Sequence, residues 1–149
     1  MVLGVKWITT RIAKGIIQGI TKDNTSRSPV PAEEGRSGRL AEELAAGFLT
    51  RHGLQVVVRN YHCRGGEIDL VCRDGHTLVF VEVRFRRRAS HGGAGDSITS
   101  GKRRRLILAA RHYLVSHAVT GTDCRFDCLL LDELSENAIE WLRNAFDAA

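Results

Sequence analysis

Hydrophobic residues recur along this chain with two different periods, which separate expected helices from expected strands. Over residues 37–52 they return every three or four positions, a spacing that predicts an amphipathic helix ended by Gly53. Residues 54–61 are rich in Val and predict a strand. Two more runs, 67–73 and 77–84, alternate and predict strands joined by a short turn.

The second half of the chain continues with a helix, a strand and a short closing element. Helical spacing over residues 102–117 predicts a helix, and the residues expected to face inward are Leu106, Ala109, Ala110, Tyr113 and Leu114. Residues 124–131 predict a buried strand, and residues 139–146 form the closing element. The expected fold is therefore α/β, with the order α-β-β-β-α-β and a mixed sheet flanked by helices.

The first 35 residues have the pattern of an extension to the domain. Apolar residues at helical spacing predict an amphipathic helix there; they are Val5, Ile8, Ile12, Ile16 and Ile20. A linker rich in Ser, Asn, Thr and Pro is expected over residues 23–31. We therefore expect an N-terminal extension over residues 1–35 and one domain over 36–149. Contact with a membrane surface or partner, packing on the domain, and fraying are all open for the helix.

The dipeptide Asp74-Gly75 predicts a tight turn between the second and third strands. With these two residues as the loop, Arg73 pairs with His76. The same register carried along the strands pairs Glu67 with Glu82.

This register gathers charged side chains on one face of the hairpin, because opposed residues and residues two apart share a face. They are Glu67, Asp69, Glu82 and Arg84. The opposite face is expected to be apolar, with Ile68, Leu70, Cys72, Val79, Val81 and Val83. Asp69 and Glu82 become diagonal neighbours, roughly 7–8 Å apart at Cα, which is within reach of one cation.

Carboxylates that share one face of a hairpin repel one another and lose solvation, so a cation would stabilise them. Oxygen ligands without a nearby His or Cys favour Mg²⁺ or Mn²⁺ over zinc. The alternative is an edge strand that exposes its acids and pairs them with Arg84 and Arg86.

The first helix offers one further acid. Stepping about 100° per residue from Ala45 places Glu42 about 60° from the centre of the apolar stripe, at the junction with the sheet. Glu43 falls about 160° away and faces solvent. We therefore expect Glu42 to reach the hairpin acids; a surface ion pair with Arg39 is the alternative.

Charge is unevenly distributed along the chain. The net charge is +5, and residues 84–105 hold eight Lys or Arg residues and one acid, whereas residues 127–147 hold six acids and one Arg. A cationic cluster of this kind is typical of proteins that bind polyanions, although a solvated surface is the other interpretation. The cationic residues expected to contact nucleic acid are Arg86, Arg87, Arg88, Lys102, Arg103, Arg104 and Arg105.

Composition narrows the class of protein. With 43% hydrophobic and 26% charged residues, the chain is typical of a globular domain and unlike a disordered one. No apolar run approaches the roughly 20 residues of a membrane span. The four cysteines lack the usual zinc-site spacing, so we expect reduced thiols and a cytoplasmic protein.

Two motifs carry a resemblance to known proteins: E-I-D-L at residues 67–70, preceded by Gly66, and F-V-E-V-R at residues 80–84. Together they resemble the YraN-like family of uncharacterised bacterial proteins, over roughly residues 36–146. That family is similar in turn to the PD-(D/E)XK, restriction-endonuclease-like nucleases, which include archaeal Holliday-junction resolvases.

The resemblance implies a restriction-endonuclease-like core and a role for each acid. Asp69 and Glu82 match the metal-binding acids, Glu42 matches the acid of the first helix, and Glu67 would be a neighbouring contact or ligand. Arg84 stands where the nuclease pattern usually has Lys. Because Arg stays protonated, it cannot act as a general base, but it can hold a phosphate or stabilise its developing charge.

Two functions follow from these patterns. The first is an endonuclease that uses Mg²⁺ or Mn²⁺ to hydrolyse phosphodiester bonds, with DNA, branched or damaged forms included, as the expected substrate. Its catalytic residues would be Glu42, Asp69, Glu82 and Arg84. The alternative is a non-catalytic nucleic-acid-binding module on a nuclease fold, because Arg84 replaces the usual Lys and no other base is evident.

Overall fold

The computed structural model describes residues 5–6, 32–86 and 98–148. Its elements, in chain order, are β1 (Val5–Lys6), α1 (Ala32–Arg51), β2 (Gln55–Cys63), β3 (Gly66–Asp74), β4 (Thr77–Phe85), α2 (Ser100–Ser116), β5 (Asp123–Leu131), a 3₁₀ helix (Glu136–Ala138) and β6 (Ile139–Phe146). The predicted order α-β-β-β-α-β is confirmed from α1 to β5. The closing element, β6, is a strand.

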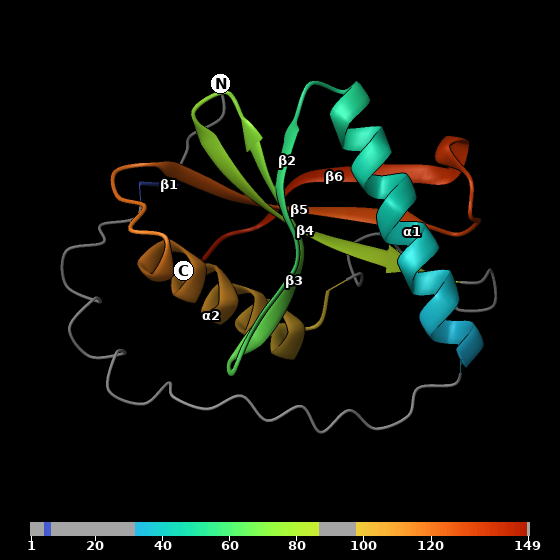
Figure 1. Ribbon diagram of the computed structural model, residues 1–149, viewed down its shortest axis with the longest axis horizontal. Coiled ribbons are helices and arrows are strands. Elements are labelled where there is room, and N and C mark those ends of the chain that lie inside the picture. The colour runs from blue at the N-terminus through green and yellow to red at the C-terminus, as the bar shows by residue number, and fades with distance from the viewer. Residues whose placement is uncertain (1–4, 7–31, 87–97, 149) are drawn as a thin grey trace.

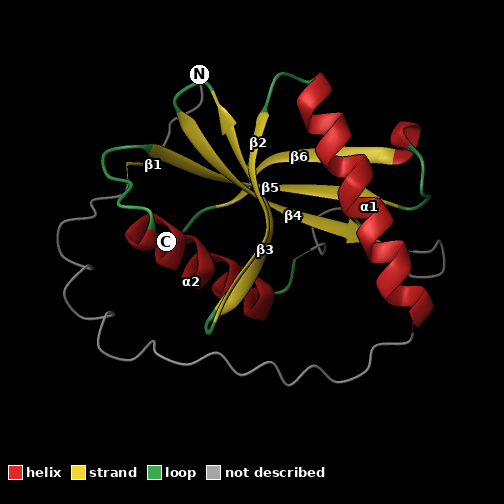
Figure 2. Cartoon of the chain, in the orientation of Figure 1, coloured by secondary structure: helices red, strands yellow, loops and turns green. Residues whose placement is uncertain are grey.

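One mixed sheet organises the molecule (Figure 2), with the strand order β1-β5-β4-β3-β2. β4 and β5 are parallel and are connected through α2, whereas the other pairs are antiparallel. Both β1 and β6 pair with β5, at different stretches of that strand. This is the α/β arrangement expected for a restriction-endonuclease-like core.

The two long helices pack against opposite faces of the sheet. Along β4, Val79 and Val81 belong to the apolar cluster under α1, whereas Leu78 and Phe80 belong to the cluster under α2. The five residues predicted to face inward from the second helix are its buried residues. α2 begins at Ser100, earlier than predicted, because Thr99 caps it by accepting a hydrogen bond from the Lys102 backbone N–H at 3.3 Å.

The predicted register of the β3–β4 hairpin is wrong by two residues. Asp74 pairs with Thr77, so the two loop residues are Gly75 and His76. Gly75 has a positive φ of 59°, which glycine adopts readily at the first loop position, whereas an Asp74-Gly75 loop of type I′ would need a positive φ at Asp74 as well. Asp74 instead stays in the strand, where its carboxylate binds Arg125 at 2.8 Å.

A shift of two residues preserves which side chains share a face. Glu82 therefore lies on the face that carries α2, as the alternation along β4 requires. Glu67 does not oppose Glu82, because the ladder between β3 and β4 ends at Leu70–Val81. Ile68 is a second correction: it packs in the cluster under α2, not with Leu70 under α1, because β3 no longer pairs with β4 there.

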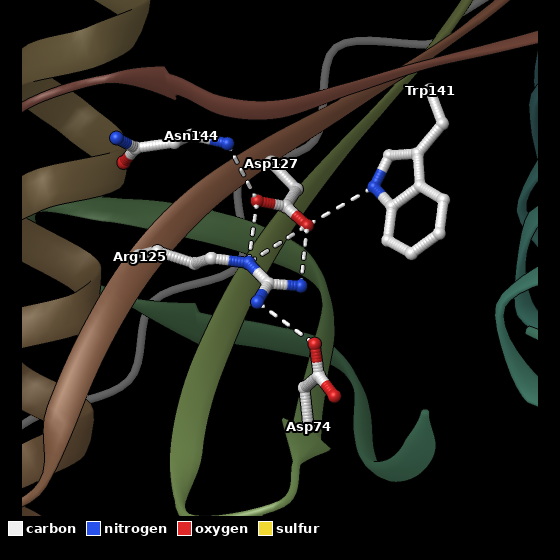
Figure 3. A network of polar contacts seen from close by, with 5 residues as sticks. All are labelled: Asp74, Arg125, Asp127, Trp141 and Asn144. Atoms are coloured by element: carbon white, nitrogen blue, oxygen red, sulfur yellow. Dashed lines mark hydrogen bonds and ion pairs between the residues drawn. The ribbon is translucent and has the colours of Figure 1, made fainter. Parts of the chain in front are cut away.

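A buried polar network fixes the closed end of this hairpin to the last two strands (Figure 3). The Asp127 carboxylate accepts hydrogen bonds from the Arg125 guanidinium at 3.0 and 3.2 Å, from the Trp141 indole N–H at 3.0 Å and from the Asn144 backbone N–H at 3.0 Å. Arg125 also binds Asp74. The buried Asp127 is therefore fully satisfied and is a structural residue.

The tip of the β2–β3 hairpin packs directly on α2. Arg64 and Gly65 form its two-residue loop, closed by the Cys63–Gly66 pair. A Cβ atom on Gly66 would lie 2.3 Å from the Arg105 carbonyl oxygen, so only glycine fits at this crossing. This close approach to Arg105 places the first residues of β3 beside the N-terminal half of α2, so that Glu67 can reach Lys102.

Three sequence expectations fall wholly or partly on residues outside the described ranges. Most of the predicted N-terminal helix lies there, but Val5 and Lys6 are in a strand, because they pair with Cys124 and Asp123 of β5. The predicted linker over 23–31 also lies outside them, as do Arg87 and Arg88 of the predicted basic residues. Among the described helices, none is long and apolar enough to cross a membrane.

Candidate active site

Asp69 lies where the sheet opens. From Asp69 back to the start of β3, this strand pairs only with β2, because the β3–β4 ladder ends at Leu70–Val81. In the β2–β3 ladder, the pair Arg59–Leu70 is followed by Tyr61–Ile68, so Asn60 and Asp69 are skipped. Asn60, which faces this gap, has a positive φ of 51°. The released carboxylate of Asp69 accepts a hydrogen bond from the Val83 backbone N–H at 2.7 Å.

Glu82 is the most deeply buried acid of the site. Its side chain is 5% exposed, and its Oε2 atom is buried without a hydrogen-bond partner. Burial of an unpaired carboxylate oxygen is unfavourable, so this atom needs either a proton shared with the neighbouring carboxylate of Asp69 or a cation. Oε1 lies 3.3 Å from the Nζ atom of Lys102.

Lys102 enters the acidic cluster from the first turn of α2. Its ammonium group also lies 3.3 Å from Oε1 of Glu67, and its side chain is 18% exposed. Glu67 is itself half exposed, and its Oε2 lies 3.4 Å from Nδ1 of His62. Lys102 therefore bridges an exposed acid and a buried one.

Glu42 approaches the same acids from α1. Glu42 is half-buried and Glu43 is exposed, which confirms the predicted orientation of the two side chains. The pKa of Glu42 is raised by burial first and then by the charge of Asp69, while a hydrogen bond with Asn60 opposes the rise. α1 and α2 thus each contribute one side chain, from opposite faces of the sheet.

The acids of the site are hard to ionise together. Burial, followed by the charge of Asp69, raises the pKa of Glu82 to about 8, although Lys102 opposes the rise. The pKa of Asp69 is also raised by burial, against the hydrogen bond from Val83 and the charge of Lys102. Burial alone would lower the pKa of Lys102, but Glu82, Glu67 and Asp69 together raise it. Near neutral pH the buried pair therefore retains a proton and Lys102 is charged.

The residues present fit a hard divalent cation. In the described part of the chain, no three carboxylate, imidazole or thiol groups converge at metal-binding positions. Mg²⁺ needs fewer, because it is usually held by one or two carboxylates together with waters and substrate phosphates. Asp69 and Glu82 supply two neighbouring carboxylates, and the unpartnered Oε2 of Glu82 is an oxygen atom suited to such an ion.

A cationic pocket of about 290 Å³ adjoins the acids, between the β2–β3 tip and the start of α2. Its lining residues are His62, Cys63, Arg64, Gly65, Gly66, Glu67, Lys102 and Arg105. Glu67 and Lys102 belong both to this pocket and to the acidic cluster. Cys63 is the half-buried thiol among the four free cysteines.

The other basic residues predicted to contact nucleic acid differ in their exposure and in their contacts. Arg104 and Arg105 are exposed on α2, and Arg84 and Arg86 are half-buried at the end of β4. Arg103 donates a hydrogen bond to the Ile98 carbonyl at 3.0 Å and lies over the Phe146 ring. Arg87 and Arg88 lie outside the described residues.

Sequence reasoning missed the position of Lys102. It assigned Lys102 to a uniform basic surface, yet the ammonium contacts Glu67 and Glu82. The available signal was that the helix over 102–117 begins with its only lysine, followed by three arginines. Asn60 was also missed, because nothing in the sequence marks a positive φ opposite Asp69.

Comparison with known proteins places this site within a recognised group. The sequence profile described as "Uncharacterised protein family UPF0102" matches residues 41–131, which include every acid of the site. A UPF0102 protein of Dechloromonas aromatica is 59% identical over 111 residues, or 74% of this chain and 88% of the relative.

Two further relatives have the same description. One, from Nitrosospira multiformis, is 56% identical over 110 residues, covering 74% of this chain and 92% of its own length. The other, from Nitrosomonas europaea, is 51% identical over 113 residues, covering 76% of this chain and 95% of its own length.

Proposed function

The chain belongs to the uncharacterised protein family UPF0102, also called YraN-like, and we propose that it is a metal-dependent endonuclease that hydrolyses phosphodiester bonds in DNA. The observation that carries this proposal is the pair of acids at the open end of the β3–β4 hairpin. Asp69 is held by Val83, and beside it Glu82 presents a buried oxygen without a partner. A divalent cation would satisfy that oxygen and offset the repulsion of the two acids.

Asp69 and Glu82 would hold Mg²⁺ or Mn²⁺, and Glu42 would complete the acidic lining from α1. The bound ion would lower the pKa of a water molecule and neutralise charge on the phosphate. Arg84 would orient the phosphate, because a guanidinium donates paired hydrogen bonds to phosphate oxygens. Glu67 would act indirectly, through its ion pair with Lys102.

The basic residues around the site support a nucleic acid as substrate. Arg86 is half-buried just after the end of β4, and Arg104 and Arg105 are exposed near the start of α2. Contacts of this type bind the phosphate backbone, so we expect affinity that falls steeply with salt and depends little on base sequence. We place this activity in the cytoplasm, where the four free thiols would stay reduced.

A second candidate function is binding without cleavage. The favouring observation is that the ammonium group of Lys102 lies 3.3 Å from both Glu67 and Glu82, so the chain itself supplies a positive charge beside these acids. In such a protein the acids would serve only to position α2 on the sheet, and cationic surfaces alone would bind nucleic acid.

A cleavage screen separates the two functions. Purified protein would be incubated with single-stranded, duplex, flap and four-way DNA and with RNA, with and without Mg²⁺ or Mn²⁺. We expect cleavage that requires metal and that is lost in Glu82→Gln, which keeps the shape of the side chain but removes its charge. Binding without cleavage of any substrate, or cleavage that survives in Glu82→Gln, would contradict the endonuclease.

A further inference from the structure

The side chain of Lys102 connects two chemically different regions. On one side its ammonium lies 3.3 Å from the buried Glu82; on the other it lines the cationic pocket with His62, Arg64 and Arg105. Within the acidic cluster it occupies the place beside Glu82 where a positive charge is needed.

A divalent cation and an ammonium group would compete for these acids. Both are attracted by the same carboxylate oxygens, and they repel each other at short range in a partly buried site. A metal ion held by Asp69 and Glu82 would therefore weaken the contact between Lys102 and Glu82. Lysine is suited to such an exchange, because its charge sits at the end of a flexible four-carbon chain.

The adjoining pocket offers the released ammonium a second position. Its cavity of about 290 Å³ is lined by Arg64 and Arg105 besides Lys102, and by the glycine backbone of the β2–β3 tip. Clustered cationic side chains with an accessible backbone are suited to bind a phosphate group. Glu67, the acid in that lining, is half exposed and is already paired with Lys102.

We propose that the ammonium group of Lys102 has two positions. Without a bound metal it pairs with Glu82; once metal binds, it turns to a phosphate of the nucleic acid in the pocket lined by Arg64 and Arg105. The inference rests on the proposed function and assigns two further features to it. The pocket becomes a subsite for a backbone phosphate, and Lys102, expected from the sequence only to be one of several nucleic-acid contacts, becomes a positioning residue there.

Metal binding tests the first position without any cleavage assay. Titration calorimetry with Mg²⁺ would compare the intact protein with Lys102→Met, which keeps the length of the side chain without its charge, and with Lys102→Arg. We expect Lys102→Met to bind Mg²⁺ about tenfold more tightly or better, because one nearby positive charge is gone. We expect Lys102→Arg to stay close to the intact protein. Arg104→Met, which removes a charge from the exposed surface of the same turn, should leave Mg²⁺ affinity unchanged.

Nucleic-acid binding tests the second position. Affinity for a short labelled DNA duplex would be measured with Ca²⁺, a divalent ion that commonly supports binding without cleavage, and with a chelator. In the intact protein a bound ion would both attract the phosphate and release Lys102, so the gain in DNA affinity should exceed the gain in Lys102→Met. Arg105→Met should lower affinity under both conditions and leave Mg²⁺ affinity unchanged.

The outcomes distinguish this inference from the proposed function. If the intact protein binds Mg²⁺ but Lys102→Met binds it equally or more weakly, the exchange is wrong and the metal site stands. If Lys102→Met lowers DNA affinity equally with and without metal, Lys102 is a permanent phosphate contact and the exchange is again wrong. If neither the intact protein nor Lys102→Met binds any divalent ion, the proposed function fails. Thermal melting of each variant would show that it is folded.

Discussion

The carboxylate of Asp69 on β3 accepts a hydrogen bond from the backbone N–H of Val83 on β4, at 2.7 Å. This contact replaces the strand pairing that ends at Leu70–Val81 and holds the two strands at a fixed separation. It also fixes Asp69 beside Glu82, the residue that precedes Val83. The same side chain therefore has a structural role and a proposed chemical one, which substitution can separate.

Asp69→Asn should separate these roles. The amide oxygen of Asn can still accept the hydrogen bond from Val83, so the fold should be retained, whereas the charge needed for metal binding is lost. We expect cleavage to fall by at least about a hundredfold, with a shift in the urea midpoint that corresponds to less than roughly 1 kcal/mol. Asp69→Ala should lose the same activity and be less stable than Asp69→Asn. Equal stability of the two variants would show that the bond to Val83 contributes nothing.

Metal affinity should rise with pH. The pKa of Glu82 is about 8 in the metal-free protein, so a metal ion must displace a proton at neutral pH. The apparent affinity for Mg²⁺ should increase by up to about tenfold per pH unit for this proton and level off above roughly pH 8. Calorimetry in buffers of different ionisation enthalpy would count the released protons. A flat affinity between about pH 6 and pH 8 would contradict the assignment of Glu82 as a ligand.

The stability of the metal-free protein should have the opposite dependence on pH. The pKa of Glu82 is higher in the folded state, about 8, than its ordinary value of 4.5, so protonation favours folding. The contribution of protonated Glu82 to the free energy of unfolding is fully present below about pH 4.5 and is lost as pH rises to about 8. Urea unfolding across this window should show a smaller decrease in Glu82→Gln, which cannot ionise.

Removal of Asp127 should be the most destabilising single change at the closed end of the hairpin. Asp127→Ala leaves the guanidinium of Arg125 buried without its main partner. Removal of one partner from a buried ion pair lowers the free energy of unfolding by roughly 3–5 kcal/mol. Asp74→Ala removes a more exposed partner of the same Arg125 and should cost about 1 kcal/mol or less. Urea unfolding measures both variants, and similar losses in the two would mean that the network does not depend on Asp127.

Gly66→Ala should displace the β2–β3 tip from α2. The new methyl group would meet the Arg105 carbonyl at 2.3 Å, so backbone must move, at a cost of about 1–3 kcal/mol. Because Glu67 follows Gly66 directly, its ion pair with Lys102 should weaken. Gly75→Ala is a useful comparison, since the Gly75 turn is far from the site and has space for a Cβ but a strained φ. An ion pair between Glu67 and Lys102 that is as strong in Gly66→Ala as in the intact protein would contradict the predicted displacement of the β2–β3 tip.

Cys63 should be the reactive thiol of the four. Burial raises the pKa of Cys72 and Cys128 to about 12 and that of Cys124 to about 11, so these thiols are rarely ionised and are poorly accessible. Cys63 is half-buried and lines the cationic pocket. A disulfide reagent should modify Cys63 first in the folded protein, and bound DNA should slow that reaction. Cys63→Ser is the control, and rapid reaction in that variant would show that a buried thiol is accessible.

Periodicity predicted which helix most of the strand residues face, because side chains alternate along a strand; Ile68 is the exception, since β3 no longer pairs with β4 there. A register error of two residues preserves which side chains of β3 and β4 share a face, so Asp69 and Glu82 were identified as neighbours despite the wrong turn. The turn itself was misplaced, since both Asp74-Gly75 and Gly75-His76 are suitable loops. The ion pair between Asp74 and Arg125, 51 residues away, favours the second and is invisible in the local sequence.

The contribution of Lys102 could not be predicted from local patterns. Its contact with Glu67 joins residues 35 positions apart, and it depends on how closely the glycine-containing tip approaches α2. Helical periodicity identified the inward face of α2 correctly. It does not predict the direction of a long side chain such as Lys102 in the first turn, at the end of that face. The direction of a long side chain there is set by the charges it meets.

The parallel pairing of β4 with β5 also determines when the site can exist during synthesis of the chain. Glu82 lies on a strand whose other neighbour, β5, is made about 40 residues later, and Lys102 is made between them. A ribosome releases the N-terminal parts first, so the acids emerge before the strand that completes their sheet. If the chain is a nuclease, a newly made copy remains inert until β5 has left the ribosome and paired with β4.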